Sequence, residues 1–180
     1  MSRARASPPA ARTGNVIRDS ALGRVPETVE EIIGLNRHVW ADSLVGPALL
    51  EILRLRNART VNCVYCRAVR YDVARRDGLT EQKAQMIDDE YRSSALSERE
   101  KLAIALADAY LGFPAGVSRD LAAQLAREFS PAQIASMLVA LLAFNFTSRT
   151  AVAVGGMPEE PLPVVEVSVA AVTGGSSAGA

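Results

Sequence analysis

The most constraining feature of this 180-residue chain is a series of local signals that start and stop helices. Ser97-Glu98-Arg99-Glu100 has the residues of a capping box, in which the serine hydroxyl and the glutamate carboxylate each accept a backbone N–H of the other residue. Ser130-Pro131-Ala132-Gln133 combines a capping hydroxyl with a proline at the first helical position and a glutamine at the third. Gly155-Gly156 stop the helix that follows. These signals predict a chain that is helical almost throughout.

The remaining helices follow from the same kinds of signal. They are expected from Pro26, over about 36–56 with a bend or restart at Pro47, through the two cysteines to about 78, and over about 81–91. Three more are expected: one from the Ser97 cap to a stop at Gly112 and Pro114, one after a cap at Ser118, and one after Ser130 to about 152. The last of these is apolar on most faces, which is typical of a central helix or of one at a subunit interface. A β-prone run over 164–172 could add a strand, but the sequence shows no partner for it. We therefore predict an all-α bundle.

Composition indicates how this bundle is organised. With 49% hydrophobic residues, the chain is expected to bury one core. We expect a disordered basic arm over 1–24, a helical domain over 25–156, and a flexible Pro/Gly/Ser-rich tail over 157–180. Twenty basic and twenty acidic side chains leave no net charge, which argues against a nucleic-acid partner.

The sequence also argues against export and against a membrane partner. The N-terminal arm lacks the apolar run of a signal peptide. The longest apolar stretch, 134–146, is interrupted by Ser136 and Asn145 and is shorter than the roughly 20 residues that span a bilayer. We expect a soluble, cytoplasmic protein.

Both cysteines of the chain lie in one short stretch, Asn62-Cys63-Val64-Tyr65-Cys66-Arg67-Ala68-Val69-Arg70. Residues three, four and seven apart share a helix face, so the two sulfurs and the Arg70 guanidinium are expected on one strip. In the first turn of a helix, free N–H groups favour the thiolate, which is the nucleophilic form. Cys66 could then attack an electrophile such as a peroxide oxygen, and Cys63 could resolve the product as a disulfide.

Other interpretations of the cysteine pair remain open from the residues alone. The two thiols could be small buried hydrophobic groups. A structural disulfide is the weakest explanation, because the closed loop is too short to restrict the unfolded chain much. Zinc usually needs four ligands, and the only histidine, His38, lies 25 residues before Cys63. We expect neither a metal nor an organic cofactor, and His38 is expected to be an ordinary helix residue.

Glu51 is the other candidate site residue. It lies in an apolar and basic run, Ala48-Leu49-Leu50-Glu51-Ile52-Leu53-Arg54-Leu55-Arg56, where an unpaired carboxylate would be costly to bury. It could form a salt bridge with Arg54 or Arg70. Alternatively, it could be an acid of raised pKa that relays protons to the thiols.

The order of these residues resembles a known family. Glu51, eleven residues, Cys63, two residues and Cys66 are similar to the Glu-x11-Cys-x2-Cys signature of the alkylhydroperoxidase D-like branch of the carboxymuconolactone decarboxylase family. The segments ILRLRNARTVNCVYC, DGLTEQK, LSEREKLAIALADA and FSPAQIASMLVALLAFNFTSR resemble further family segments in the same order, the last one up to its Asn145 and Arg149. The resemblance covers roughly residues 25–156.

This resemblance implies a fold and a reaction. The family is all-helical and assembles into trimers or hexamers, so a homo-oligomer is expected. Its redox-active members reduce organic hydroperoxides without a cofactor and are themselves reduced by a dithiol protein or a lipoyl group. By position, Cys66 corresponds to the peroxidatic cysteine, Cys63 to the resolving thiol and proton donor, and Glu51 to the carboxylate of a proton relay.

Arg70 stands where the family usually has a histidine. Arginine stays protonated near neutrality and cannot shuttle a proton. It could hold a thiolate, or it could pin Glu51 in its ionised form, which predicts slower proton delivery and weak peroxidase activity. Tyr65 or Tyr71 could supply the proton instead.

Three functions are thus compared. The leading one is a thiol-dependent reductase of organic hydroperoxides or small disulfides, with Cys66, Cys63, Glu51 and Arg70 at its site. The second is a non-catalytic or redox-sensing oligomer that binds a partner, which Arg70 favours. Lactone decarboxylation ranks last, because that branch generally lacks the cysteine pair and this chain has no set of histidines for acid–base chemistry.

Overall fold

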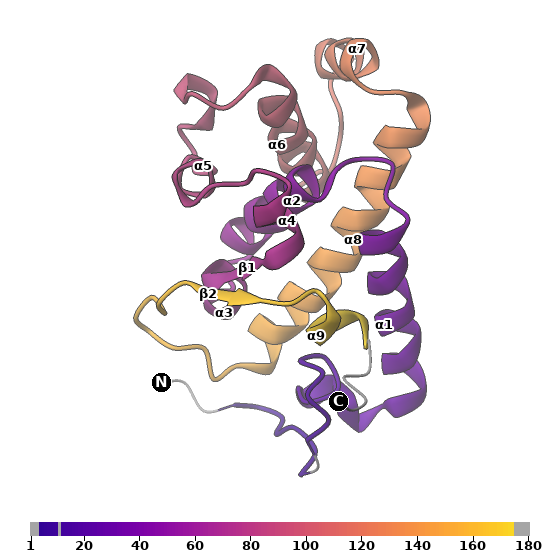
Figure 1. Ribbon diagram of the computed structural model, residues 1–180, viewed down its shortest axis with the longest axis vertical. Helices are drawn as coiled ribbons and strands as arrows, with labels where there is room; N and C mark the ends of the chain where they lie inside the picture. Colours follow the sequence, from indigo (N-terminus) through magenta and orange to yellow (C-terminus); the bar gives the residue numbers. More distant parts are fainter. Residues whose placement is uncertain (1–3, 11, 175–180) are drawn as a thin grey trace.

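The structure is a computed structural model, and it describes residues 4–10 and 12–174. The chain forms a helical bundle with one small two-stranded sheet (Figure 1). The α-helices are α1 (Pro26–Ala41), α2 (Pro47–Thr60), α3 (Val64–Ala68), α4 (Asp72–Arg76), α5 (Glu81–Gln85), α6 (Glu98–Leu111), α7 (Arg119–Glu128), α8 (Pro131–Val154) and α9 (Ala170–Thr173). The strands are β1 (Val69–Tyr71) and β2 (Val165–Val167), and short 3-10 turns lie at Ala21–Arg24 and Tyr91–Ser93. The predicted all-α fold class is confirmed.

The local capping signals give the helix starts that they predict. Ser97 and Glu100 form a complete capping box at the start of α6, and Ser130 and Gln133 form one at the start of α8. The predicted second helix over about 36–56 is wrong at its start, because residues 36–41 belong to α1, and α2 begins at Pro47, where a restart was allowed. The predicted helix over 81–91 is too long, since α5 ends at Gln85. The capped starts depend on hydrogen bonds within four residues of the chain, so the sequence is sufficient to predict them.

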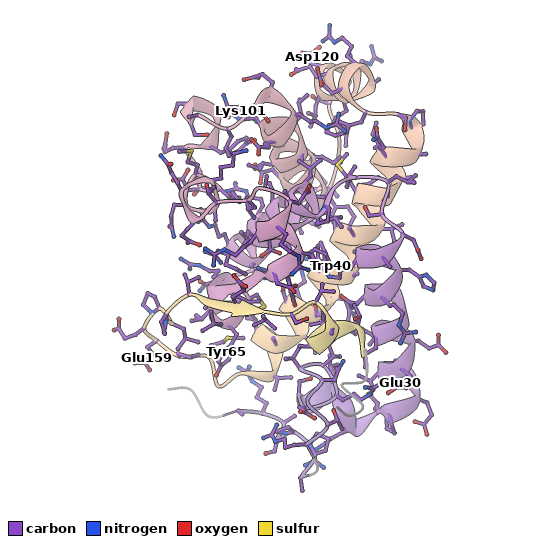
Figure 2. The ribbon with its side chains drawn as sticks, in the orientation of Figure 1. Glu30, Trp40, Tyr65, Lys101, Asp120 and Glu159 are labelled. Atoms are coloured by element: carbon purple, nitrogen blue, oxygen red, sulfur yellow. A yellow bond between two sulfur atoms is a disulfide. The ribbon has the colours of Figure 1, made fainter. Side chains whose placement is uncertain are left out.

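The centre of the bundle is α2, which packs against both α6 and α8. Nine of its fourteen residues are buried, including Leu50, Ile52 and Leu53, none of which exposes any surface. Burying a side chain of this size contributes about 1.5–3 kcal/mol. Trp40 of α1 lies inside the bundle (Figure 2). It packs against Tyr71 and Phe144, with ring centroids 4.9 and 5.7 Å apart.

The long apolar helix α8 is not the central one. Met137, Leu141 and Phe144 face the core, whereas Val139, Leu142 and Phe146 expose 46%, 53% and 43% of their surface. The sequence indicated either a central helix or a helix at a subunit interface. These exposed side chains exclude the fully enclosed, central position. By length and composition α8 could cross a membrane, with 33% of its most apolar window buried, but the core helix of a soluble protein meets the same criteria.

The predicted helix through the cysteines is wrong in its length. It divides into α3, β1 and α4, because Val69 takes an extended conformation and its strand pairs in parallel with β2, Val69 opposite Val165 and Tyr71 opposite Val167. The buried guanidinium of Arg54 binds the carbonyl oxygens of Cys66 and Val69, at 2.7 Å each. A continuous helix would use both oxygens as acceptors for its own N–H groups.

The described parts of both terminal segments lie against the helices. The backbone N–H of Arg5 donates to the carbonyl of Val154, that of Val16 donates to Ala171, and Ile17 is buried. The described part of the tail after α8 passes α3, supplies β2, and packs against α1 through α9 (Figure 1). The predicted division into an arm, a helical domain and a tail stays a prediction, and the β-prone run does find its partner strand.

Candidate active site

The end of α2 places the cysteine pair. Asn62 has a left-handed backbone with φ 55°, a conformation that asparagine tolerates better than most residues. This residue reverses the chain so that the N–H of Cys63 donates to the carbonyl of Ala58 at 2.9 Å. Cys63 is then the N-cap of α3, and its sulfur accepts the N–H of Cys66 at 3.2 Å. As predicted, Cys66 lies in the first turn of a helix.

The two sulfurs form a disulfide, Cys63–Cys66. Cys63 is fully buried, whereas Cys66 is half-buried. An incoming molecule therefore has better access to the sulfur of Cys66 than to that of Cys63. This difference fits the assignment of Cys66 as the attacking residue and Cys63 as the resolving one.

Glu51 and Arg54 form a closed ion pair on α2. Both guanidinium–carboxylate hydrogen bonds are 2.6 Å long, and the side chains expose 0% and 7% of their surface. The N–H of Tyr71 approaches the same carboxylate at 3.4 Å, and the Tyr71 ring lies under the guanidinium, 5.1 Å from it. Burial acts to lower the pKa of Arg54, but the charge and hydrogen bonds of Glu51 outweigh it and raise that pKa. Of the two salt bridges considered for Glu51, the structure contains the one with Arg54.

Arg70 makes neither of the contacts that were expected of it. It lies on β1 rather than on the cysteine helix, so the predicted strip of two sulfurs and a guanidinium is wrong. Its Nε and Nη2 donate to the two carboxylate oxygens of Glu81 at 2.9 Å, and its Nη1 donates to the carbonyls of Arg67 and Val69. The guanidinium is thus committed to Glu81, on α5.

A second polar network, which the sequence analysis missed, reaches the sulfur of Cys66. The hydroxyl of Ser148 donates to the Cys66 sulfur at 3.5 Å, and the Asn57 amide donates to that hydroxyl at 3.1 Å. Asn145 donates to the oxygen of Asn57 at 2.8 Å, and the exposed Arg149 donates to Asn145 at 2.9 Å. Asn57 and Ser148 are themselves buried.

One signal in the sequence could have indicated this network. Glu51, Arg54 and Asn57 are spaced three residues apart and so lie on one face of α2, while Asn145, Ser148 and Arg149 interrupt the apolar α8. Two polar interruptions on two apolar helices predict a buried contact between those helices. The connection from Asn57 to Ser148 spans 91 residues, and no local spacing rule gives it.

The other candidate residues lie outside these networks. His38 is exposed near the end of α1, where its Nδ1 pairs with Asp42 at 2.7 Å. Tyr65 is partly exposed and donates to the carbonyl of Gly156 at 3.3 Å. Burial raises the pKa of Tyr71 to about 12, which makes it a poorer proton donor. In the described part of the chain, no three His, Cys, Asp or Glu side chains are grouped to hold a metal ion.

Comparison with known proteins identifies the fold. No family profile matches the chain, and no curated protein matches it by sequence. A protein of unknown function from Agrobacterium tumefaciens, described provisionally as the antioxidant defence protein AhpD, is 25% identical with a TM-score of 0.63, over 75% of this chain and 93% of its own. The debrominase Bmp8, solved as a cysteine-to-alanine variant with 2,3,4-tribromopyrrole, is 20% identical with a TM-score of 0.65, over 78% of this chain and 74% of its own. The second similarity concerns the fold alone.

The helical bundle is similar to that of an alkylhydroperoxidase D-like protein, and the chain has a Cys-x-x-Cys pair that forms a disulfide. The resemblance that Glu51, Cys63 and Cys66 indicated in the sequence is thereby confirmed.

Proposed function

We propose that this chain is a thiol-dependent reductase of organic hydroperoxides or small disulfides that works through Cys63 and Cys66. The observation that carries the proposal is the disulfide with one accessible sulfur, Cys66, which accepts a hydrogen bond from the buried hydroxyl of Ser148. A hydroxyl donor favours the thiolate form of the cysteine once the disulfide is reduced. The fold shared with a provisional antioxidant defence protein supports the same conclusion.

The reaction proceeds in three steps. The Cys66 thiolate attacks the terminal oxygen of the hydroperoxide, so that an S–O bond forms, the O–O bond breaks, and the alkoxide leaves and takes up a proton. Cys63, now a thiolate because its proton has gone to the alkoxide, attacks the sulfur of the Cys66 sulfenic acid. The S–S bond forms, the S–O bond breaks, and the hydroxide leaves as water with a proton from solvent. A dithiol or lipoyl reductant, itself oxidised to a disulfide, returns both thiols.

The site delivers protons differently from the relay that the family resemblance implies. Glu51 is held by Arg54 in a closed ion pair, and Arg70 is held by Glu81. Neither residue is placed to carry a proton to the leaving alkoxide. We therefore propose that the Cys63 thiol donates the proton that the leaving alkoxide takes up, and that hydroperoxide reduction is slow. Thiol–disulfide exchange needs no such relay, and the same geometry favours it.

A second candidate function, a redox sensor, is favoured by the same closed ion pair. A sensor requires one oxidation of Cys66 and no rapid turnover, so it does not need a proton carrier. The two functions differ in whether an added dithiol drives continuous consumption of peroxide or restores the thiols only once.

The experiment that tests the proposal begins with the reduced protein and one equivalent of cumene hydroperoxide. We expect the two free thiols to disappear and the tryptic peptide 60–67, which contains both cysteines, to lose two hydrogens in mass. The Cys63→Ser variant should accumulate a sulfenic acid that dimedone traps at Cys66, and the Cys66→Ser variant should not react. Persistence of both thiols with cumene hydroperoxide and with a small disulfide would exclude the proposed function.

We also propose that the chain assembles with copies of itself and works in a reducing, cytoplasmic compartment without a nucleic-acid or membrane partner. Val139, Leu142 and Phe146 are spaced three and four residues apart, and they form an exposed apolar stripe along α8. Stripes of this kind usually mark an interface. The Leu142→Glu variant should lower the mass measured by light scattering from a trimer or hexamer toward a monomer. A wild-type monomer would exclude the assembly.

A further inference from the structure

A cavity of about 750 Å³ lies beside the cysteine turn. Its walls come from the end of α2, from α3 and β1, from the segment between α8 and β2, and from Arg5. Asn62 and Val64, which flank Cys63 in the chain, and Arg67, which follows Cys66, line the cavity. Figure 2 shows Glu159, another lining residue, on the loop between α8 and β2, at the end of the molecule where α3 lies. A molecule bound here would be close to the reactive turn.

The described lining of this cavity carries an excess of positive charge. Four arginines contribute to it, Arg5, Arg59, Arg67 and Arg70, against the single carboxylate of Glu159. Arg70 is already paired with Glu81. The remaining three donate to uncharged oxygens, Arg59 to the Ala84 carbonyl, Arg67 to the Asn62 amide, and Arg5 to the Ala153 carbonyl.

The surroundings of Arg59 disfavour its protonated, charged form. Burial acts to lower the pKa of Arg59, and although Asp88 opposes this, the positive charges of Arg67 and Arg70 contribute to a pKa below the ordinary value. A bound anion would remove this penalty, because an opposite charge within about 4–6 Å favours the charged form. Guanidinium groups also match a carboxylate in shape, with two parallel N–H···O bonds.

The rest of the lining is largely apolar. Val64, Met157, Leu162 and Val164 contribute accessible side chains to it, and Leu55 is buried behind them. A small inorganic anion would leave these side chains uncovered. A cavity that combines arginines with aliphatic side chains fits a molecule with a charged end and a hydrocarbon chain.

We propose that this cavity binds the carboxylate and chain of an aliphatic substrate, so that the substrate class is hydroperoxides of aliphatic carboxylic acids. The proposal rests on the proposed function for its chemical step and deepens it by naming the substrate. The hydroperoxide is reduced to the corresponding hydroxy acid by the two-thiol reaction given above. Binding itself needs only the cavity and its arginines, so it can be measured without turnover.

The test uses the disulfide form of the full chain, which cannot react with peroxide, and titrates octanoate by calorimetry. We expect octanoate to bind, octanol and inorganic phosphate to bind at least about tenfold more weakly, and added salt to weaken octanoate binding. Arg67→Gln should weaken octanoate binding about tenfold, because Arg67 is exposed and donates only to Asn62 among the described residues. The matched control is Arg127→Gln, an exposed arginine on α7 outside the cavity lining, which should bind as the wild type does.

Several outcomes would overturn the proposal. They are no octanoate binding, equal binding of octanoate and octanol, equal binding in the Arg67→Gln variant, and phosphate binding as tight as octanoate. Octanoate binding without any thiol oxidation by peroxide would overturn the proposed function but would leave the carboxylate site in place. With both intact, the KM for a carboxylate-bearing hydroperoxide should rise in Arg67→Gln, while the KM for cumene hydroperoxide stays unchanged.

Discussion

The two polar networks around the cysteine turn differ in their charge and in the atoms that they contact. On one side, Glu51 and Arg54 satisfy each other in a sealed ion pair whose spare donors bind the carbonyls of Cys66 and Val69. On the other side, Asn57 and Ser148 are neutral, end on the Cys66 sulfur, and connect through Asn145 to the exposed Arg149. The charged network binds the backbone of the cysteine turn, whereas the neutral network contacts the sulfur of Cys66. A charge in a motif is therefore no proof that the charge takes part in the chemistry.

The largest expected effect is the loss of stability when the ion pair between Glu51 and Arg54 is broken. Arg54→Met leaves the carboxylate of Glu51 buried without a cation, and removing one partner of a buried ion pair costs about 3–5 kcal/mol of unfolding free energy. Urea unfolding of the disulfide form, followed by circular dichroism, measures the loss. The double variant Glu51→Leu/Arg54→Met should recover part of it, because no charge is then left unpaired.

A matched arginine on the same helix gives the control. Arg56 pairs with Asp89 and Asp108, whose side chains are 94% and 31% exposed, so Arg56→Met should cost only about 1 kcal/mol. If Arg54→Met is no more harmful than Arg56→Met, Glu51 has access to water, and the contrast between the two networks fails.

The next effect concerns the neutral network. Ser148→Ala removes the hydroxyl that donates to the Cys66 sulfur, so a smaller fraction of Cys66 is thiolate at neutral pH. Alkylation of Cys66 by iodoacetamide should slow about tenfold near pH 7 and reach its maximum at higher pH, measured in a Cys63→Ser background. Ser136→Ala changes another hydroxyl of α8 that bonds to Ser43 and Leu44, and it should leave alkylation unchanged. Equal rates in the two variants would remove Ser148 from the site.

A smaller effect appears in the acid stability of the ion pair that holds Arg70. Burial acts to raise the pKa of Glu81, but the hydrogen bonds from Arg70 and Gln85 outweigh it, so the pKa lies below its ordinary value of 4.5. Because the folded-state pKa is depressed, this stabilisation is present above pH 4.5 and is lost as the pH falls through the folded value. In Glu81→Gln, urea midpoints should fall less steeply below pH 4.5 than in the wild type. Parallel curves would show that Glu81 does not contribute.

The smallest effect is expected at the position where the sequence departs from the family that it resembles. Arg70→His should bring no gain in peroxide turnover, because this side chain is directed toward Glu81 and the backbone of α3 rather than toward Cys66. Steady-state consumption of cumene hydroperoxide with excess dithiol measures it, with circular dichroism to confirm the fold. A large gain would show that an imidazole at this position reaches the sulfur of Cys66. It would contradict the conclusion that residue 70 only pairs with Glu81.

Different parts of the site were predictable to different degrees. The adjacency of Cys63 and Cys66 followed from their spacing. For Glu51, the sequence left two possible salt-bridge partners, Arg54 and Arg70. The choice between Arg54 and Arg70 could not be made from spacing, because it depends on the chain leaving the helix at Val69. Ser148 was not predicted, since its contact with Cys66 joins residues 82 positions apart.

The sequence by itself determined where most helices begin, that two sulfurs lie within bonding distance, and that the bundle is all-helical. The helix starts and the proximity of the two sulfurs depend mainly on interactions across three or four residues, so they need few contacts with the rest of the chain. Only the tertiary structure decided which arginine neutralises Glu51, which hydroxyl contacts Cys66, and which arginines line the cavity beside them. These pairings depend on how far each side chain is removed from water, and that depth is a property of the whole packed bundle.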